Sequence, residues 1–252
     1  NRYNSGALEI QALAYRRMGK KEAAAQILKQ LSDQDPLDHV ARFEDWRLKP
    51  TEAKRKEFQD MIRHEFPHES YLEMALFYIR VGAVEDAIEL LKMSPEYPTV
   101  AYWLAFLTAD SAPAESKRYL ETAGRLSPRL VFPHREEEIP LLEWVRSVRP
   151  DDWRPNYYLG LLLWGKGRLE EAKALLARCD SSDYAPLFVT RAMLYRQSDP
   201  QRAQADYEKA WKLDGKSWRN WHALIDFHIA EKRFDQALNL AKEASPLFPG
   251  QT

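Results

Sequence analysis

Apolar residues recur along this 252-residue chain at the spacing of amphipathic helices, in pairs of stretches separated by a short turn. In the first stretch they follow i, i+3, i+4 and i+7, which places them on one buried face. A glycine or a polar pair then favours a turn with positive φ, and an alanine five residues later allows a second helix to pack closely. A proline is expected to end the unit because it cannot continue a helix. Four stretches show this order: Ala12, Tyr15, Gly19, Ala24, Leu28, Leu31 and Pro36; Ala75, Tyr78, Gly82, Ala87, Leu91, Pro95 and Pro98; Leu159, Gly160, Leu163, Gly167, Ala172 and Leu176; and Trp221, Leu224, Ile225, His228, Ala237, Ala241, Ala244 and Pro249.

Three further units keep this spacing with some positions replaced. Their small residues and those of the clear units are separated by one or two periods of about 30–34 residues. Neither helix of a unit can bury its apolar stripe alone, so neighbouring units are expected to stack. The degraded units contain Trp103, Leu104, Leu107, Ser116, Leu120, Ala123 and Pro128; Leu194, Ser198, Asp199, Pro200, Ala203, Tyr207 and Ala210; and Phe43, Trp46, Ile62 and Pro67, with Arg55 at the small-residue position.

These residues resemble the tetratricopeptide repeat family over most of residues 5–250. The resemblance implies an all-α fold, a right-handed superhelical stack (α-solenoid) of about seven helix-turn-helix pairs. One insert does not fit the period: residues 129–135 indicate an extended connector, and residues 136–148 an extra amphipathic helix. We therefore expect three parts, namely N-terminal repeats in residues 1–128, a connector with an extra helix in 129–152, and C-terminal repeats in 153–252.

Charge and composition argue against several classes of function. The chain has 37 basic and 38 acidic residues, so it lacks the basic excess of a nucleic-acid binder. Its single Cys179 excludes an internal disulfide and indicates a small buried core residue. No run of about 18 apolar residues predicts a membrane span. Because the chain starts at Asn1 without a signal-like stretch, we expect a fragment of a longer protein, in the cytoplasm or the periplasm.

The sequence His64-Glu65-Phe66-Pro67-His68 matches the H-E-x-x-H zinc motif. That motif requires one continuous helix, since the two histidines must share a face. Pro67 should end the helix at about Phe66, so we expect a solvated loop and no metal.

The remaining candidates for chemistry are weak. His222 and Asp226 share a helix face and can pair, whereas His228 should be a packed imidazole. The acidic run of residues 136–138 indicates a solvated helix start, and no Gly-rich phosphate loop or G-x-S-x-G element occurs. The sequence therefore predicts no enzyme, no cofactor and no metal site.

In the tetratricopeptide family the first helices line a concave groove, and the resemblance carries these positions over to the present chain. It implies aromatic and arginine side chains that could hold a peptide and its carboxylates. The corresponding N-terminal positions are more apolar: Glu9, Leu13, Arg16, Leu72, Leu76 and Ile79. Where some members of the family clamp a terminal carboxylate with Lys and Asn, this chain has Glu9, Leu13, Leu72 and Leu76, which disfavours such a clamp. The predicted partner-binding residues are Arg154, Tyr157, Trp164, Tyr195, Arg196, Arg219, His222 and Asp226, with Leu161 and Phe188 beside them.

Two functions follow. The first is a protein-interaction scaffold that binds a peptide or a partner helix in the C-terminal groove. The second comes from a further similarity, carried by the insert and by Tyr157 to Gly160, to the C-terminal repeats of certain large bacterial proteins. In those proteins a mutarotase-like β-sandwich of unknown role precedes the repeats. The chain would then be an accessory part of a carbohydrate-related or envelope protein, positioning an upstream domain or mediating self-association.

Overall fold

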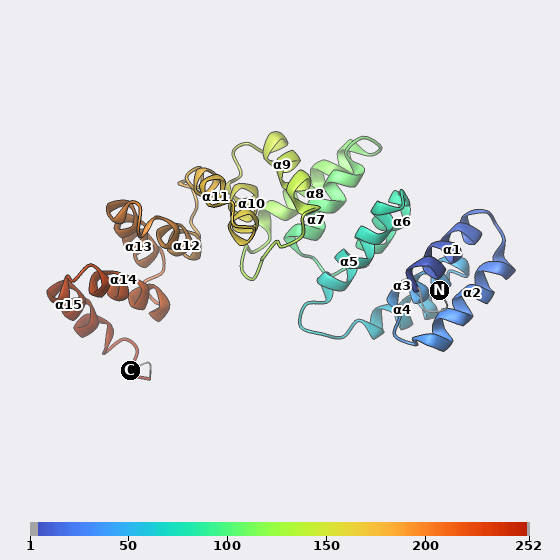
Figure 1. Ribbon diagram of the computed structural model, residues 1–252, viewed down its shortest axis with the longest axis horizontal. Helices are drawn as coiled ribbons and strands as arrows, with labels where there is room; N and C mark the ends of the chain where they lie inside the picture. The colour runs from blue at the N-terminus through green and yellow to red at the C-terminus, as the bar shows by residue number, and fades with distance from the viewer. Residues whose placement is uncertain (1–4, 251–252) are drawn as a thin grey trace. The chain divides into compact units, whose positions relative to one another are not determined.

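The computed structural model describes residues 5–250, which contain fifteen α-helices and no strand (Figure 1). Their order is α1 (Ser5–Arg17), α2 (Lys21–Gln34), α3 (His39–Leu48), α4 (Glu52–Met61), α5 (Pro67–Arg80), α6 (Val84–Leu91), α7 (Pro98–Thr108), α8 (Pro113–Arg125), α9 (Glu138–Val148), α10 (Trp153–Gly165), α11 (Leu169–Leu176), α12 (Ala185–Tyr195), α13 (Pro200–Leu213), α14 (Trp218–Ala230) and α15 (Phe234–Ala244).

Consecutive helices pack as pairs, and the pairs are the predicted repeat units. They are α1–α2, α3–α4, α5–α6, α7–α8, α10–α11, α12–α13 and α14–α15, with α9 as the one extra helix. The predicted fold class, all-α with about seven helix pairs and one insert, is confirmed. The chain divides into two compact units, Asn1–Leu126 and Ser127–Thr252. Each is described below by itself.

Three predicted glycine turns have the same backbone geometry. Gly19, Gly82 and Gly167 have φ of 72°, 73° and 77°. In each turn the glycine N–H donates to the carbonyl three residues back, and the next N–H donates to the carbonyl five residues back. These are the two bonds of a Schellman motif, which needs a residue in the left-handed region. The fourth turn, between α14 and α15, repeats both bonds with Lys232 at φ 60° in place of glycine.

Small residues lie where the two helices of a pair approach each other, as predicted. Ala24, Ala87, Ala172 and Ala203 are completely buried. The α10–α11 pair approaches closely at Gly160 of α10, where an added Cβ would lie 3.0 Å from Cγ of Leu176 on α11. Close helix packing therefore explains these positions in the repeat.

The prolines have a different role from the predicted one. Pro67 and Pro98 each occupy the first turn of the next helix, α5 and α7, and Pro113 and Pro200 do the same in α8 and α13. The first N–H groups of a helix have no partner within the helix, so a proline there loses no bond and has the right φ. A proline in this repeat begins a helix more often than it ends a unit.

Unit 1 is held together by buried charges as well as by apolar packing. Glu44 of α3 accepts two bonds from Arg16 of α1, at 2.6 and 2.9 Å, and one from the hydroxyl of Tyr78, at 2.9 Å. Asp86 of α6 accepts from Arg16, Arg17 and Arg47, at 2.9 to 3.0 Å. Burial would raise the pKa of Asp86, but the three guanidinium groups lower it below its ordinary value. We call these residues the Asp86 network.

Unit 2 has a comparable ion pair in its interior. Arg191 of α12 donates to both carboxylate oxygens of Asp206 on α13, at 2.6 and 2.8 Å. It also donates to Asp180 at 2.6 Å and to the carbonyl of Leu176 at 3.0 Å. Arg191 and Asp206 are nearly inaccessible to solvent, so each charge depends on the other for compensation.

The extra helix α9 covers α10 with three completely buried residues, Leu141, Leu142 and Val145. The prediction of a solvated acidic start is wrong for one residue. Glu138 is buried and accepts the N–H groups of His134 and Arg135, both at 3.0 Å. Burial raises the pKa of Glu138, although these two N–H bonds oppose the shift. Glu138 thus ties the connector to α9.

Candidate partner-binding surface

The predicted binding residues come from α10, α12 and α14 of unit 2, and they differ in their accessibility. Tyr157 and Phe188 are buried. The Tyr157 ring lies 6.0 Å from those of Trp153 and Tyr184, and burial raises the pKa of its hydroxyl. It fills space between helices, so its side chain is not accessible to a partner.

Arg154 is largely occupied by its neighbours within unit 2. Its guanidinium lies 4.9 Å from the Trp153 ring centroid, and one of its nitrogens is 3.2 Å from the carboxylate of Asp152. Asp152 also accepts the backbone N–H of Arg154, at 3.0 Å, and so caps α10. The side chain keeps partial exposure, as does Trp164 on the same helix.

Tyr195 lies between helix pairs with its ring only partly accessible. The Arg202 guanidinium lies 4.1 Å from the ring centroid, and the Tyr195 hydroxyl donates to the carbonyl of Lys173 at 3.4 Å. The next residue, Arg196, extends to α14 and donates to the carbonyl of Asp226 at 3.2 Å. This bond places Arg196 directly beside the predicted residues of α14.

Those residues of α14 form a continuous exposed row. His222 Nδ1 lies 3.2 Å from the carboxylate of Asp226 one turn later, which confirms the predicted pairing. Arg219 is exposed one turn before His222. His228, by contrast, is buried, and burial together with Arg233 lowers its pKa. It is the packed imidazole that the sequence predicts.

Two apolar residues of this surface, Met193 and Ile229, are not among the predicted binding residues. Met193 of α12 precedes Arg196 by three residues, and Arg196 directly follows α12 with helical φ and ψ. Ile229 follows Asp226 by three residues on α14, so each apolar residue lies on the same side as its polar neighbour. About half of each side chain is exposed. Both residues lie offset from the core stripe, as the predicted binding residues do. They were not predicted because neither side chain carries a charge or an aromatic ring. We call Met193, Arg196, Arg219, His222, Asp226 and Ile229 the α12–α14 surface.

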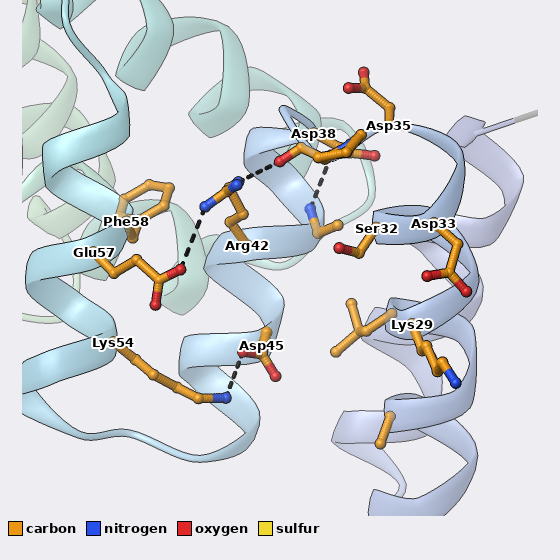
Figure 2. A pocket seen from close by; sticks show the side chains of 14 residues that line it. Lys29, Ser32, Asp33, Asp35, Asp38, Arg42, Asp45, Lys54, Glu57 and Phe58 are labelled. Atoms are coloured by element: carbon orange, nitrogen blue, oxygen red, sulfur yellow. Dashed lines mark hydrogen bonds and ion pairs between the residues drawn. The ribbon is translucent and has the colours of Figure 1, made fainter.

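A hollow lies in unit 1 between α2 and the α3–α4 pair, with a volume of about 330 Å³ (Figure 2). Five carboxylates and three basic side chains line it. Lys54 bonds Asp45, and Arg42 lies 3.7 Å from Glu57 and donates to the carbonyl of Pro36. The carboxylates of Asp35 and Asp38 accept the N–H groups of Leu37 and Ala41. Most of the charged side chains that line the hollow therefore have partners within unit 1, including backbone groups of the turn between α2 and α3.

The zinc-like motif is divided between a loop and a helix, but not in the predicted way: α4 ends at Met61 and not at about Phe66, and Pro67 begins α5, in which His68 is buried. His64 follows the end of α4 and bonds Ser70 at 2.8 Å, whereas His68 lies in α5 and stacks on Tyr97 with 3.5 Å between the ring centroids.

Burial raises the pKa of the Cys179 thiol to about 12, which keeps it protonated. Within residues 5–250, no group of three or more His, Cys, Asp or Glu side chains is placed to hold a metal ion.

None of the helices in the described part of the chain is long and apolar enough to pass through a bilayer.

No curated protein matches the chain. Several solved structures are similar at low identity. MamA (residues 41 to the end) from Desulfovibrio magneticus RS-1 is 15% identical with a TM-score of 0.42, covering 73% of this chain and 96% of that one.

The TPR protein TTC0263 from Thermus thermophilus is 19% identical with a TM-score of 0.32, covering 94% of this chain and 99% of that one. The type IV pilus biogenesis factor PilW is 14% identical with a TM-score of 0.40, covering 99% and 96%. Two family models described as tetratricopeptide repeat match residues 139–186 and 194–252. These two segments of unit 2, which contain nearly all of α9 together with α10, α11, α13, α14 and α15, therefore carry tetratricopeptide repeats.

Proposed function

We propose that this chain is a non-catalytic protein-interaction scaffold, and that its partner binds as a peptide or a helix along the α12–α14 surface. The observation that carries the proposal is the contiguity of that surface. The bond from Arg196 to Asp226 and the pair of Asp226 with His222 connect two first helices of successive repeats. The tetratricopeptide repeats matched over this part of the chain support the class of function.

The chemistry of the surface specifies the ligand in outline. Arg219 is exposed and has no ion pair within residues 5–250, so its guanidinium can form two parallel bonds with a carboxylate. Met193 and Ile229 offer exposed apolar area on either side of the charged row. A segment that alternates an acidic residue with aliphatic or aromatic residues would satisfy both features. We therefore propose an acidic, partly apolar peptide, and no nucleic acid, as the partner.

Selection from a displayed random-peptide library tests this function. The unmodified chain should enrich acidic and apolar sequences, and the double variant Arg196→Ala with Arg219→Ala should lose at least ten-fold in affinity for them. Arg118→Ala with Arg125→Ala is the matched control, since it removes two exposed arginines from α8 in unit 1. Enrichment of peptides that bind both double variants equally well would refute the α12–α14 surface.

The second predicted function, an accessory part that positions an upstream mutarotase-like domain, stays a prediction. It concerns sequence outside the present chain. Identification of a β-rich region directly before Asn1 in the encoding gene would support it, and a second repeat array there would oppose it.

A further inference from the structure

Arg146 of α9 carries a half-buried guanidinium group with a single partner. Its Nε donates to Oδ1 of Asn156 on α10, at 2.7 Å. Its two Nη groups have no hydrogen bond or ion pair within residues 5–250, and both remain accessible to solvent. Burial and the charge of Arg178 lower the pKa of Arg146. Glu143, one turn earlier on α9, opposes this shift but forms no ion pair with Arg146.

Two other arginines that are withdrawn from solvent are neutralised within the fold. Arg16 is paired with Glu44, and Arg191 is paired with Asp206. Burial alone would lower the pKa of both arginines, but their carboxylate partners raise it. A charge that leaves water without gaining a partner is costly. Arg146 therefore differs from these two in that its charge is available to a bound anion.

Arg178 brings a second positive charge to the same end of the helices. It comes two residues after the end of α11, is exposed, and forms no ion pair in the described part of the chain. The next residue, Cys179, is buried, and its Sγ lies 3.5 Å from the carbonyl oxygen of Trp153 in α10. This contact holds the segment after α11 against the first turn of α10. Two unpaired guanidinium groups thus meet beside that turn.

Asn156, in the second turn of α10, adds a neutral donor between them. Its side chain is only 7% exposed. A guanidinium group can only donate, so the bond from Arg146 must end on the amide oxygen of Asn156, and this fixes the orientation of the amide. Its Nδ2 has no partner among the described residues, yet it is accessible from outside. A nearly buried donor without an acceptor indicates that an acceptor comes from elsewhere.

We propose that Arg146, Arg178 and Asn156 form a binding site for a phosphate group, either free phosphate or the phosphate of a small monoester. A phosphate monoester carries about −1.5 to −2 charges at pH 7, which matches the two guanidinium groups. Its oxygens can accept from both arginines and from Nδ2 at once. A carboxylate has a single charge and two oxygens, so it would neutralise only one arginine. This site goes beyond the proposed function, because it uses neither α12 nor α14.

Isothermal titration calorimetry of the whole chain against inorganic phosphate, phenyl phosphate and acetate at low ionic strength tests the site. We expect a Kd of about 1 mM or tighter for phosphate, and a Kd about ten-fold weaker for acetate. Equal affinities for inorganic phosphate and phenyl phosphate indicate that the site recognises the phosphate group alone. A Kd for phenyl phosphate that is tighter by about ten-fold indicates a monoester as the ligand.

Arg178→Ala is the main variant, since Arg178 is exposed and its removal should leave the fold intact. It should weaken phosphate binding by about ten-fold, and Arg146→Met should weaken it at least as much. The matched control is Arg118→Ala, which removes an exposed arginine without an ion pair from α8 and should bind phosphate as the unmodified chain does. In NMR spectra, phosphate should shift the side-chain amide resonances of Asn156 in the control and not in Arg178→Ala.

Three results would overturn the proposal. The first is the absence of binding by either phosphate compound up to about 20 mM. The second is binding that Arg178→Ala and Arg146→Met leave unchanged, which would place the phosphate elsewhere. The third is an affinity for acetate equal to that for phosphate, which would show that the site does not select a phosphate group. Because Arg178→Ala keeps Arg146 in place, its result is decisive even if Arg146→Met fails to fold.

Discussion

Replacing Lys232 by glycine is expected to stabilise the α14–α15 pair. Lys232 has φ 60° and fills the position that Gly19, Gly82 and Gly167 occupy in three other turns with the same two hydrogen bonds. A side chain with a Cβ is strained in the left-handed region, whereas glycine is not. The Lys232 side chain is exposed, so its removal sacrifices little packing.

The magnitude follows from two opposing effects. A non-glycine residue in the left-handed region costs about 1–2 kcal/mol. Glycine also makes the unfolded chain more flexible, which lowers the stability of the folded state by about 0.4–1 kcal/mol and offsets part of the gain. The expected net gain for Lys232→Gly is therefore about 0.5–1 kcal/mol. Gly82→Ala should lose about 1 kcal/mol, and this loss is purely conformational because an added Cβ at Gly82 meets no atom within 4 Å.

Native-state hydrogen exchange gives the required local readout, since a repeat array need not unfold in a single step. Amide protons of α15, such as that of Ala237, should exchange more slowly in Lys232→Gly. Glu231→Gly is the matched control: Glu231 has φ −79°, so glycine there should speed exchange. If Lys232→Gly exchanges at the original rate or faster while Gly82→Ala costs nothing, the conformational argument is refuted.

Three further predictions concern packing and charge. Gly160→Ala should lower the free energy of unfolding by about 1–3 kcal/mol in urea denaturation, because the added methyl overpacks the α10–α11 contact. Asp206→Ala should cost about 3 kcal/mol, since it leaves the buried Arg191 with only the exposed carboxylate of Asp180 as a counter-charge; an unchanged urea midpoint would contradict this. Burial and the nearby Asp38 raise the pKa of Glu9 from 4.5 to about 7. The folded chain therefore favours the protonated carboxyl, and the free energy of unfolding falls as the pH rises from 4.5 to about 7. Thermal unfolding of Glu9→Gln and of the unmodified chain should be compared at pH 5 and at pH 8. The difference in free energy of unfolding between them should shift in favour of Glu9→Gln by about 1–2 kcal/mol from pH 5 to pH 8, a figure that allows for the partial exposure of Glu9.

The repeat pattern predicted the fold well because it reports backbone geometry that each unit needs for itself. Gly82 marks a turn with positive φ, and Ala203 marks a close helix contact, whichever residues surround them. Lys232 shows the limit of that reasoning. Its side chain gives no sign of its φ, and only the position within the repeat reveals it.

The binding residues were harder to predict because accessibility depends on neighbouring helices. Tyr157 has the helical offset of a surface residue, yet Trp153 and Tyr184 enclose its ring. The buried charges also gave no signal in the sequence, since Asp86 and Arg191 resemble any surface charge until their partners are known. Whether the α12–α14 surface binds a partner stays a prediction.

The Asp86 network also changes how unit 1 should come apart. In a linear repeat protein each unit contacts only its neighbours, so an end unit can fray while the rest stays folded. Here Arg16 and Arg17 of the first pair bond directly to Asp86 of the third pair, past the second. Loss of α1 would leave the buried Glu44 without its guanidinium partner and would reduce the arginines bonded to Asp86 to Arg47, so the penalty would fall on the second and third pairs as well as the first. The first six helices should therefore melt as one cooperative block, without gradual fraying from the N-terminal end.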